Sequence, residues 1–244
     1  MNMSEALSRR AFLATVATGA GLGFRAQDSR LAARPYPPRR SPSVGETRFG
    51  EGDRGGVLYV PEGYDPERSA PLLVALHGAG GRAGNWRRFY ETCEEHGIVL
   101  LAPDARGRTW DRVTGAFGPD VRFIDAALRH AFDRCVVDPA RIALGGFSDG
   151  ASYALSLGVS NGDLFSHLIA FSPGFSNPTE PIVGTPRVFV SHGTGDRILP
   201  VAASRRAIVP MFEMDGYPVE YVEFEGGHEI PPEVVRRAVA WFLA

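Results

Sequence analysis

The chain is organised around a Gly-x-Ser-x-Gly pentapeptide at residues 146–150, which reads Gly-Phe-Ser-Asp-Gly. Residues 141–145 before it form a short apolar run typical of a buried strand, and residues 151–157 after it are typical of a helix. A serine flanked by small residues at such a junction predicts a nucleophile elbow. The hydroxyl of Ser148 would then project at a helix N-terminus, where unpaired N–H groups favour a developing negative charge. The alternative is an ordinary Gly/Ser-rich loop, and the flanking strand and helix favour the elbow.

Strand and helix patterns alternate along the chain beyond residue 55. Apolar runs predict strands at residues 56–61, 72–76, 98–102, 141–145, 168–171, 187–191 and 219–224. Helical spacing predicts helices at residues 85–96, 120–135, 151–157, 202–215 and 232–243. Such alternation predicts an α/β fold with a mostly parallel sheet and helices on both faces. Sites in these sheets lie at the carboxyl ends of the strands.

Residues 1–26 are expected to form a signal peptide and are set aside from the fold. Residues 8–13 read Ser-Arg-Arg-Ala-Phe-Leu and resemble a twin-arginine export signal, followed by an apolar stretch at 11–24. That stretch is shorter than the roughly 20 residues that span a bilayer. We expect cleavage after Ala26, no membrane anchor, passage through the twin-arginine machinery, and a periplasmic or extracellular location. A frayed amphipathic helix is the alternative.

Residues 27–55 are expected to form an extended, exposed arm rich in proline and arginine, and residues 56–244 one catalytic domain. All 26 basic residues of the 244 are arginine, so chemistry that needs a lysine is excluded. Eight of the 26 arginines, but only three of the 28 acidic residues, lie within residues 1–48. The remainder is therefore mildly acidic, which argues against a nucleic-acid partner.

The two cysteines, Cys93 and Cys135, fall on predicted helices that would cover opposite faces of the sheet. Buried free thiols are therefore expected, with a disulfide as the alternative in an exported protein. Cys93 and His96 have the spacing of metal ligands but no further cluster, so no metal is expected.

A serine nucleophile needs a base and a group that orients the base. Of the six histidines, His228 alone lies between the last strand and the last helix, where it completes the chain order Ser…Asp…His. His77 and His192 each begin a His-Gly pair at a strand end, and structural hydrogen bonding is the favoured role for them. The other histidines, which are taken as surface or structural residues, are His96, His130 and His167.

The acid should follow the preceding strand, which indicates Asp196, with a helix-capping turn as its alternative role. Asp104 is the competing acid. Donors for an oxyanion are expected from the backbone N–H of Ala79 or Gly80, in the glycine-rich turn after the first long strand, and from that of Asp149.

The motifs at residues 76–81, 146–150, 193–196 and 227–228 together resemble the α/β-hydrolase superfamily. The resemblance is to small bacterial phospholipase/carboxylesterases and to polyhydroxybutyrate-depolymerase-like, or feruloyl-esterase-like, enzymes. It implies a serine hydrolase that cleaves small carboxylic esters through a Ser148-His228-Asp196 triad and an acyl-enzyme, without a cofactor. A serine peptidase, an acyltransferase and a non-catalytic binding protein are the alternatives.

The connection between the predicted strands at 168–171 and 187–191 is too short for a large lid. The substrate pocket is therefore expected to be shaped by short loops. The residues expected to line it are Trp86, Trp110, Ile198 and Leu199, with Phe117 and Phe175 as further candidates, although any of these aromatic residues could belong to the core.

Overall fold

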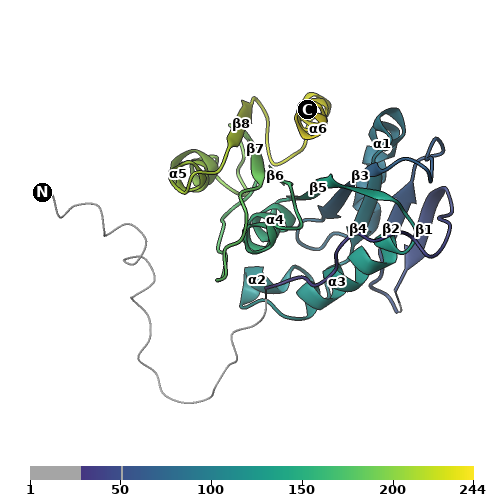
Figure 1. Ribbon diagram of the computed structural model, residues 1–244. Coiled ribbons are helices and arrows are strands. Elements are labelled where there is room, and N and C mark those ends of the chain that lie inside the picture. The colour runs from purple at the N-terminus through teal and green to yellow at the C-terminus, as the bar shows by residue number, and fades with distance from the viewer. Residues whose placement is uncertain (1–28, 51) are drawn as a thin grey trace, which may run out of the picture.

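In the computed structural model, which describes residues 29–50 and 52–244, eight strands form one sheet in the order β1-β2-β4-β3-β5-β6-β7-β8 (Figure 1). The strands are β1 Gly45–Phe49, β2 Gly56–Val60, β3 Ala70–Leu76, β4 Val99–Pro103, β5 Val137–Phe147, β6 His167–Phe171, β7 Arg187–Gly193 and β8 Val219–Phe224. β1 pairs antiparallel with β2, and β2 with β4, while all the other pairs are parallel. The carboxyl ends of β3 to β8 therefore meet at one edge, and the predicted α/β fold is confirmed.

Helices cover both faces of this sheet. They are η1 Ala83–Phe89, α1 Tyr90–His96, α2 Asp111–Thr114, α3 Pro119–Phe132, α4 Asp149–Gly158, η2 Val159–Asn161, the π-helix η3 Ser204–Ile208, α5 Val209–Met214 and α6 Pro232–Leu243. The central strands contribute side chains to two separate cores, one on each face of the sheet, because side chains alternate along a strand. On β3, Leu72 and Val74 face the core under α3, α4 and α5, while Leu73 and Ala75 face the core under η1, α1 and α6. Figure 1 shows α1 and α6 on one side of the sheet and α3 and α4 on the other.

The two cysteines lie on opposite faces, as expected. Cys93 belongs to the core under α1 and α6, and Cys135 to the core under α3 and α4. Both thiols are free and buried. Burial raises the pKa of each thiol to about 12, so both stay protonated and unreactive at neutral pH.

The arm expected at residues 27–55 is not simply exposed, and this part of the prediction is wrong. Leu31 and Ala33 are buried in the first core. The Asn161 side chain accepts the N–H of Leu31 at 2.8 Å, and the Asp125 carboxylate accepts the N–H of Ala33 at 2.7 Å. The arm ends in strand β1, which extends the sheet. The predicted signal peptide, residues 1–26, lies outside the described residues.

No helix within the described part of the chain is long and apolar enough to cross a membrane.

The connection between β6 and β7 is held against α4 and forms no helix, so the expectation of little or no lid is confirmed. The hydroxyl groups of Ser152 and Ser156 on α4 accept the N–H groups of Gly174 and Asn177 at 2.9 and 2.8 Å. The Asn177 carbonyl in turn accepts a hydrogen bond from the Arg112 guanidinium at 2.9 Å. These bonds fix the connection against α4 at Ser152 and Ser156.

Candidate active site

Ser148 occupies the predicted sharp turn between β5 and α4. Its backbone has φ 58° and ψ −122°, a left-handed conformation that is uncommon for a residue with a side chain. The Ser148 N–H donates to the Phe171 carbonyl of β6 at 2.9 Å, which holds the turn against the sheet. Strain of this kind persists only where the surrounding structure imposes it, and it concentrates at functional sites.

The two glycines of the motif are required by close backbone approach. A Cβ at Gly146 would lie 2.3 Å from the Gly150 carbonyl carbon, and a Cβ at Gly150 would lie 2.1 Å from the Leu76 carbonyl oxygen. Neither neighbour can move freely, because both belong to the backbone. The Gly-x-Ser-x-Gly pattern therefore follows from the packing of β3, β5 and α4 around the serine.

Three side chains from separate loops meet at the carboxyl edge of the sheet. The Nε2 atom of His228 lies 2.8 Å from the Ser148 Oγ atom, and its Nδ1 atom lies 2.6 Å from the Asp196 Oδ2 atom. Asp196 follows β7, and His228 lies between β8 and α6. A carboxylate only accepts hydrogen bonds, so Nδ1 carries the ring proton and the Nε2 lone pair faces the serine hydroxyl. This arrangement can remove the proton of Ser148.

The Asp196 side chain is completely buried. Its Oδ1 atom accepts the N–H groups of Ile198 and Leu199 at 2.8 and 2.9 Å. Burial by itself raises the pKa of the carboxyl, but the hydrogen bonds from His228, Leu199 and Ile198 outweigh it and bring the pKa below its ordinary value. Asp196 is therefore ionised at neutral pH and can stabilise a positive charge on His228.

Two backbone N–H groups near the Ser148 turn have no acceptor among the described residues. The turn after β3 abuts the serine, since a Cβ on Gly78 would lie 3.2 Å from the Ser148 Cβ atom. Within the described residues, no acceptor takes the N–H of Ala79 or that of Asp149, the first residue of α4. The Asp149 carboxylate accepts a hydrogen bond from Thr109 Oγ1 at 2.7 Å.

The expectation that Gly80 could supply a donor is wrong. Gly80 has φ 70°, and its N–H donates to the Arg108 carbonyl at 2.8 Å. The loop after β4 therefore uses this donor to anchor the turn. Ala79 is the remaining candidate of the two.

Two of the four predicted pocket residues belong to the core instead. Trp110 is fully buried, and its Nε1 donates to the His77 carbonyl at 2.7 Å, which anchors the same turn. Trp86 is buried beside Phe89 under η1. Phe117 is likewise fully buried.

Ile198 and Leu199, the other two predicted pocket residues, are not part of the core. Ile198 is 68% exposed, which is unusual for so large an apolar side chain, and Leu199 is half-buried against Gly174. Both directly follow the Asp196 turn. Both are joined to Asp196 through their backbone N–H groups.

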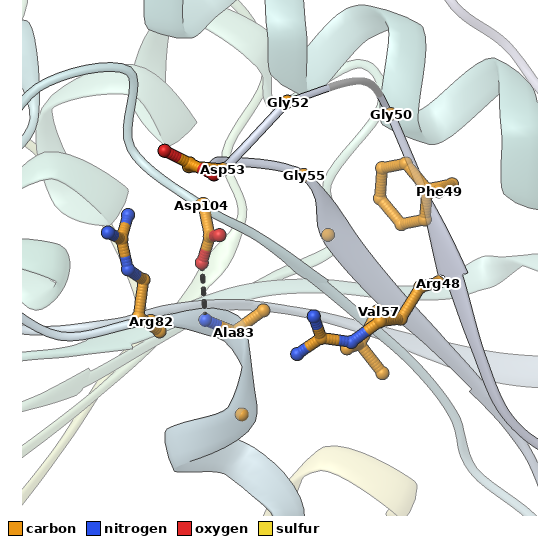
Figure 2. Close-up of a pocket in the computed structure, with 12 residues that line it drawn as sticks. Arg48, Phe49, Gly50, Gly52, Asp53, Gly55, Val57, Arg82, Ala83 and Asp104 are labelled. Atoms are coloured by element: carbon orange, nitrogen blue, oxygen red, sulfur yellow. Dashed lines mark hydrogen bonds between the residues drawn. The ribbon is translucent and has the colours of Figure 1, made fainter.

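Asp104, the competing acid, is held elsewhere. Its Oδ1 atom accepts the N–H of Ala83 at 2.5 Å at the start of η1. Figure 2 shows this bond inside a cavity of about 230 Å³, between Arg82 on one side and Arg48 on the other. The ring nitrogen of His228 that Asp104 would have to contact is bonded to Asp196.

Sequence reasoning missed one buried side chain at the site. His192, which was taken as structural, lies with its Nε2 atom 3.3 Å from the Asp196 Oδ2 atom. Its place four residues before Asp196 is visible in the sequence, but the contact depends on how the turn folds back. Among the described residues, no group of three His, Cys, Asp or Glu side chains is placed to hold a metal ion.

A mostly parallel sheet with a serine elbow at the end of a central strand defines the α/β-hydrolase fold. Residues 98–243 match the model of the phospholipase/carboxylesterase family. The chain belongs to this family of ester hydrolases.

Individual relatives agree with this assignment. The chain is 28% identical over 218 residues to feruloyl esterase C of Emericella nidulans. The alignment covers 75% of this chain and 79% of the relative. Its fold resembles that of esterase PE8, with a TM-score of 0.62, 21% identity, and coverage of 82% of this chain and 99% of the other. The phospholipase/carboxylesterase of Dyadobacter fermentans gives a TM-score of 0.59, 18% identity, and coverage of 83% and 99%.

Proposed function

We propose that this protein is a serine hydrolase that cleaves small carboxylic esters by way of an acyl-enzyme. The observation that carries the proposal is the unbroken chain of hydrogen bonds from Asp196 through His228 to Ser148. A serine hydroxyl becomes a useful nucleophile only when an oriented base can take its proton. The bond from Ser148 to His228 is short enough for proton transfer, and the bond from His228 to Asp196 orients the ring.

In the proposed reaction, the Ser148 Oγ atom attacks the acyl carbon of the ester while His228 Nε2 takes the hydroxyl proton. The negative charge that develops on the carbonyl oxygen is stabilised by the N–H groups of Ala79 and Asp149. The leaving alkoxide receives the proton from His228, and the acyl group stays on Ser148. Water then attacks the acyl-enzyme with the same base, and the acid product leaves. No step in this scheme requires a cofactor.

An aromatic acyl group of modest size is the proposed substrate class. The apolar surface of Ile198 and Leu199 beside the triad supports it, as does the similarity to proteins named feruloyl esterase. A peptidase or acyltransferase could use the same triad. Product analysis with matched ester, amide and alcohol acceptors separates these reactions.

The site is expected to act on dissolved substrates without activation at an oil–water interface. Residues 172–186 are bonded to α4 and form no amphipathic helix that would have to open. Rates on a short-chain triglyceride should therefore follow simple saturation up to and beyond its solubility limit. Each further buried methylene should add only about 0.8 kcal/mol, so short acyl and aryl esters should be preferred only modestly over one another. A sharp rise at the interface, or a strong preference for long chains, would contradict the open site.

We also propose that the protein is exported by the twin-arginine route to the periplasm or beyond, with residues 1–26 as its signal. Changing Arg9 and Arg10 together to lysine should stop export and leave the precursor in the cytoplasm, because this route reads the arginine pair. Fractionation of cells that express the two forms measures the effect. Normal export of the double variant, in a host where the route is intact, would point to the general secretory route instead.

A further inference from the structure

A second histidine, His192, approaches the same carboxylate oxygen of Asp196 that His228 contacts. His192 lies near the carboxyl end of β7, and its side chain is completely buried. Its Nε2 atom lies 2.7 Å from the Leu199 carbonyl oxygen and 3.3 Å from the Asp196 Oδ2 atom. Its Nδ1 atom lies 2.8 Å from the hydroxyl oxygen of Ser204, which is also fully buried.

The partners of His192 determine where its proton sits. The Leu199 carbonyl and the Asp196 carboxylate can only accept, so Nε2 carries a hydrogen and donates it toward both. Nδ1 is paired with the Ser204 hydroxyl, which can donate or accept a hydrogen bond. Each ring nitrogen of His192 therefore has a hydrogen-bond partner.

These bonds tie the two ends of the Asp196 turn together. The N–H groups of Ile198 and Leu199 hold one carboxylate oxygen, Oδ1. His192 holds the carbonyl of the same Leu199 and approaches the other carboxylate oxygen, the one that His228 uses. Without His192, the turn keeps its two bonds to Oδ1, but the Leu199 carbonyl loses its partner and Oδ2 is left with His228 alone, so the carboxylate is held less firmly.

We propose that His192 is a positioning residue that orients the Asp196 carboxylate, and through it the ring of His228. This inference rests on the proposed function of the Ser148-His228-Asp196 triad. His192 is too deeply buried to contact a substrate, so its effect must pass through Asp196. Partners that orient a catalytic group from behind typically change activity by about 10- to 100-fold, and small displacements in such networks have large effects.

Three substitutions of His192 distinguish the contribution of Nε2 from that of Nδ1. His192→Gln can place an amide N–H near the position of Nε2, whereas His192→Asn reaches only the position of Nδ1. His192→Leu keeps the volume and offers no hydrogen bond. We expect His192→Asn and His192→Leu to lower kcat by about 10- to 100-fold with KM nearly unchanged, and His192→Gln to retain most of the activity.

A double-mutant cycle supplies the sharpest test. If His192 acts through Asp196, then His192→Asn should have little further effect once Asp196 is changed to Asn. A merely structural histidine would lower activity by the same factor in both backgrounds. His167→Leu is the matched control, because His167 is another buried histidine but begins β6 at the opposite edge of the sheet. It should leave kcat unchanged in the folded protein.

The outcomes distinguish this inference from the proposed function. Wild-type kcat in a folded His192→Asn or His192→Leu protein, or equal losses in both arms of the cycle, would overturn the positioning role while the triad stands. Should His192→Leu fail to fold, the polar Asn and Gln pair still decides the question, since both can remain hydrogen-bonded in the core. Ester turnover that is independent of Ser148 would overturn the proposed function itself.

Discussion

Replacing Ser148 with alanine is expected to lower kcat/KM for ester hydrolysis by about 10⁴-fold or more. Members of a triad act as a unit, so the loss of the nucleophile removes the benefit of the base as well. The fold should survive, because the hydroxyl oxygen makes one side-chain hydrogen bond, to His228, whose side chain is partly exposed to water. Turnover of a soluble aryl ester and thermal unfolding of the same preparation measure the two effects.

The control for this substitution is Ser156→Ala. Ser156 is fully buried two turns further along α4, where it holds the β6–β7 connection. A fluorophosphonate probe should label the wild type and Ser156→Ala but not Ser148→Ala, because only the activated serine reacts. Substantial turnover or labelling in a folded Ser148→Ala protein would show that the nucleophile lies elsewhere. Absence of labelling in the wild type would favour a binding protein.

Replacing Asp196 with asparagine should lower kcat by about 10²- to 10⁴-fold. The amide can donate a hydrogen bond to Nδ1 of His228, which places the ring proton on Nε2, facing Ser148. In that tautomer, His228 cannot accept the hydroxyl proton. The amide also removes the negative charge that stabilises the protonated ring. Measuring kcat and KM separately tests this account, since the loss should fall on kcat.

Asp104→Asn is the matched control, because Asp104 directly follows β4 at this edge and is the competing acid. Its carboxylate holds the start of η1 through Ala83 instead of the histidine. The variant should keep kcat within a few-fold of the wild type. An inactive Asp104→Asn protein together with a nearly normal Asp196→Asn protein would reverse the assignment.

The sharp turn at Ser148 and the fold could be predicted because their signals are local. The glycines around Ser148 report a backbone constraint that acts within five residues and one neighbouring strand. The continuous apolar runs of β3 to β7 indicate strands buried on both faces, as is typical of the centre of a parallel sheet. The order of Asp196 and His228 after Ser148 follows from the order of the strands, so the three could be proposed together before any distance was known.

The sequence predicted the polar residues of the site better than the apolar ones. Trp110 lies in a loop near the site and was expected to line a pocket, yet it is fully buried with its N–H on the His77 carbonyl. The sequence around an aromatic residue in a loop does not indicate whether its side chain faces the solvent or the core. The direction of its side chain depends on the strands and helices that come to surround it.

The sequence by itself therefore determined the class of fold, the serine elbow and the chain order of Ser148, Asp196 and His228. Tertiary structure alone decided which backbone donors stay free, where the arm packs, and what lies behind the acid. The N–H of Gly80 donates to the Arg108 carbonyl, and the N–H of the buried Leu31 donates to the Asn161 side chain. His192 contacts Asp196 only because the turn after β7 folds back on the strand. Each of these outcomes depends on a partner or a direction in space that the spacing of residues along the chain does not encode.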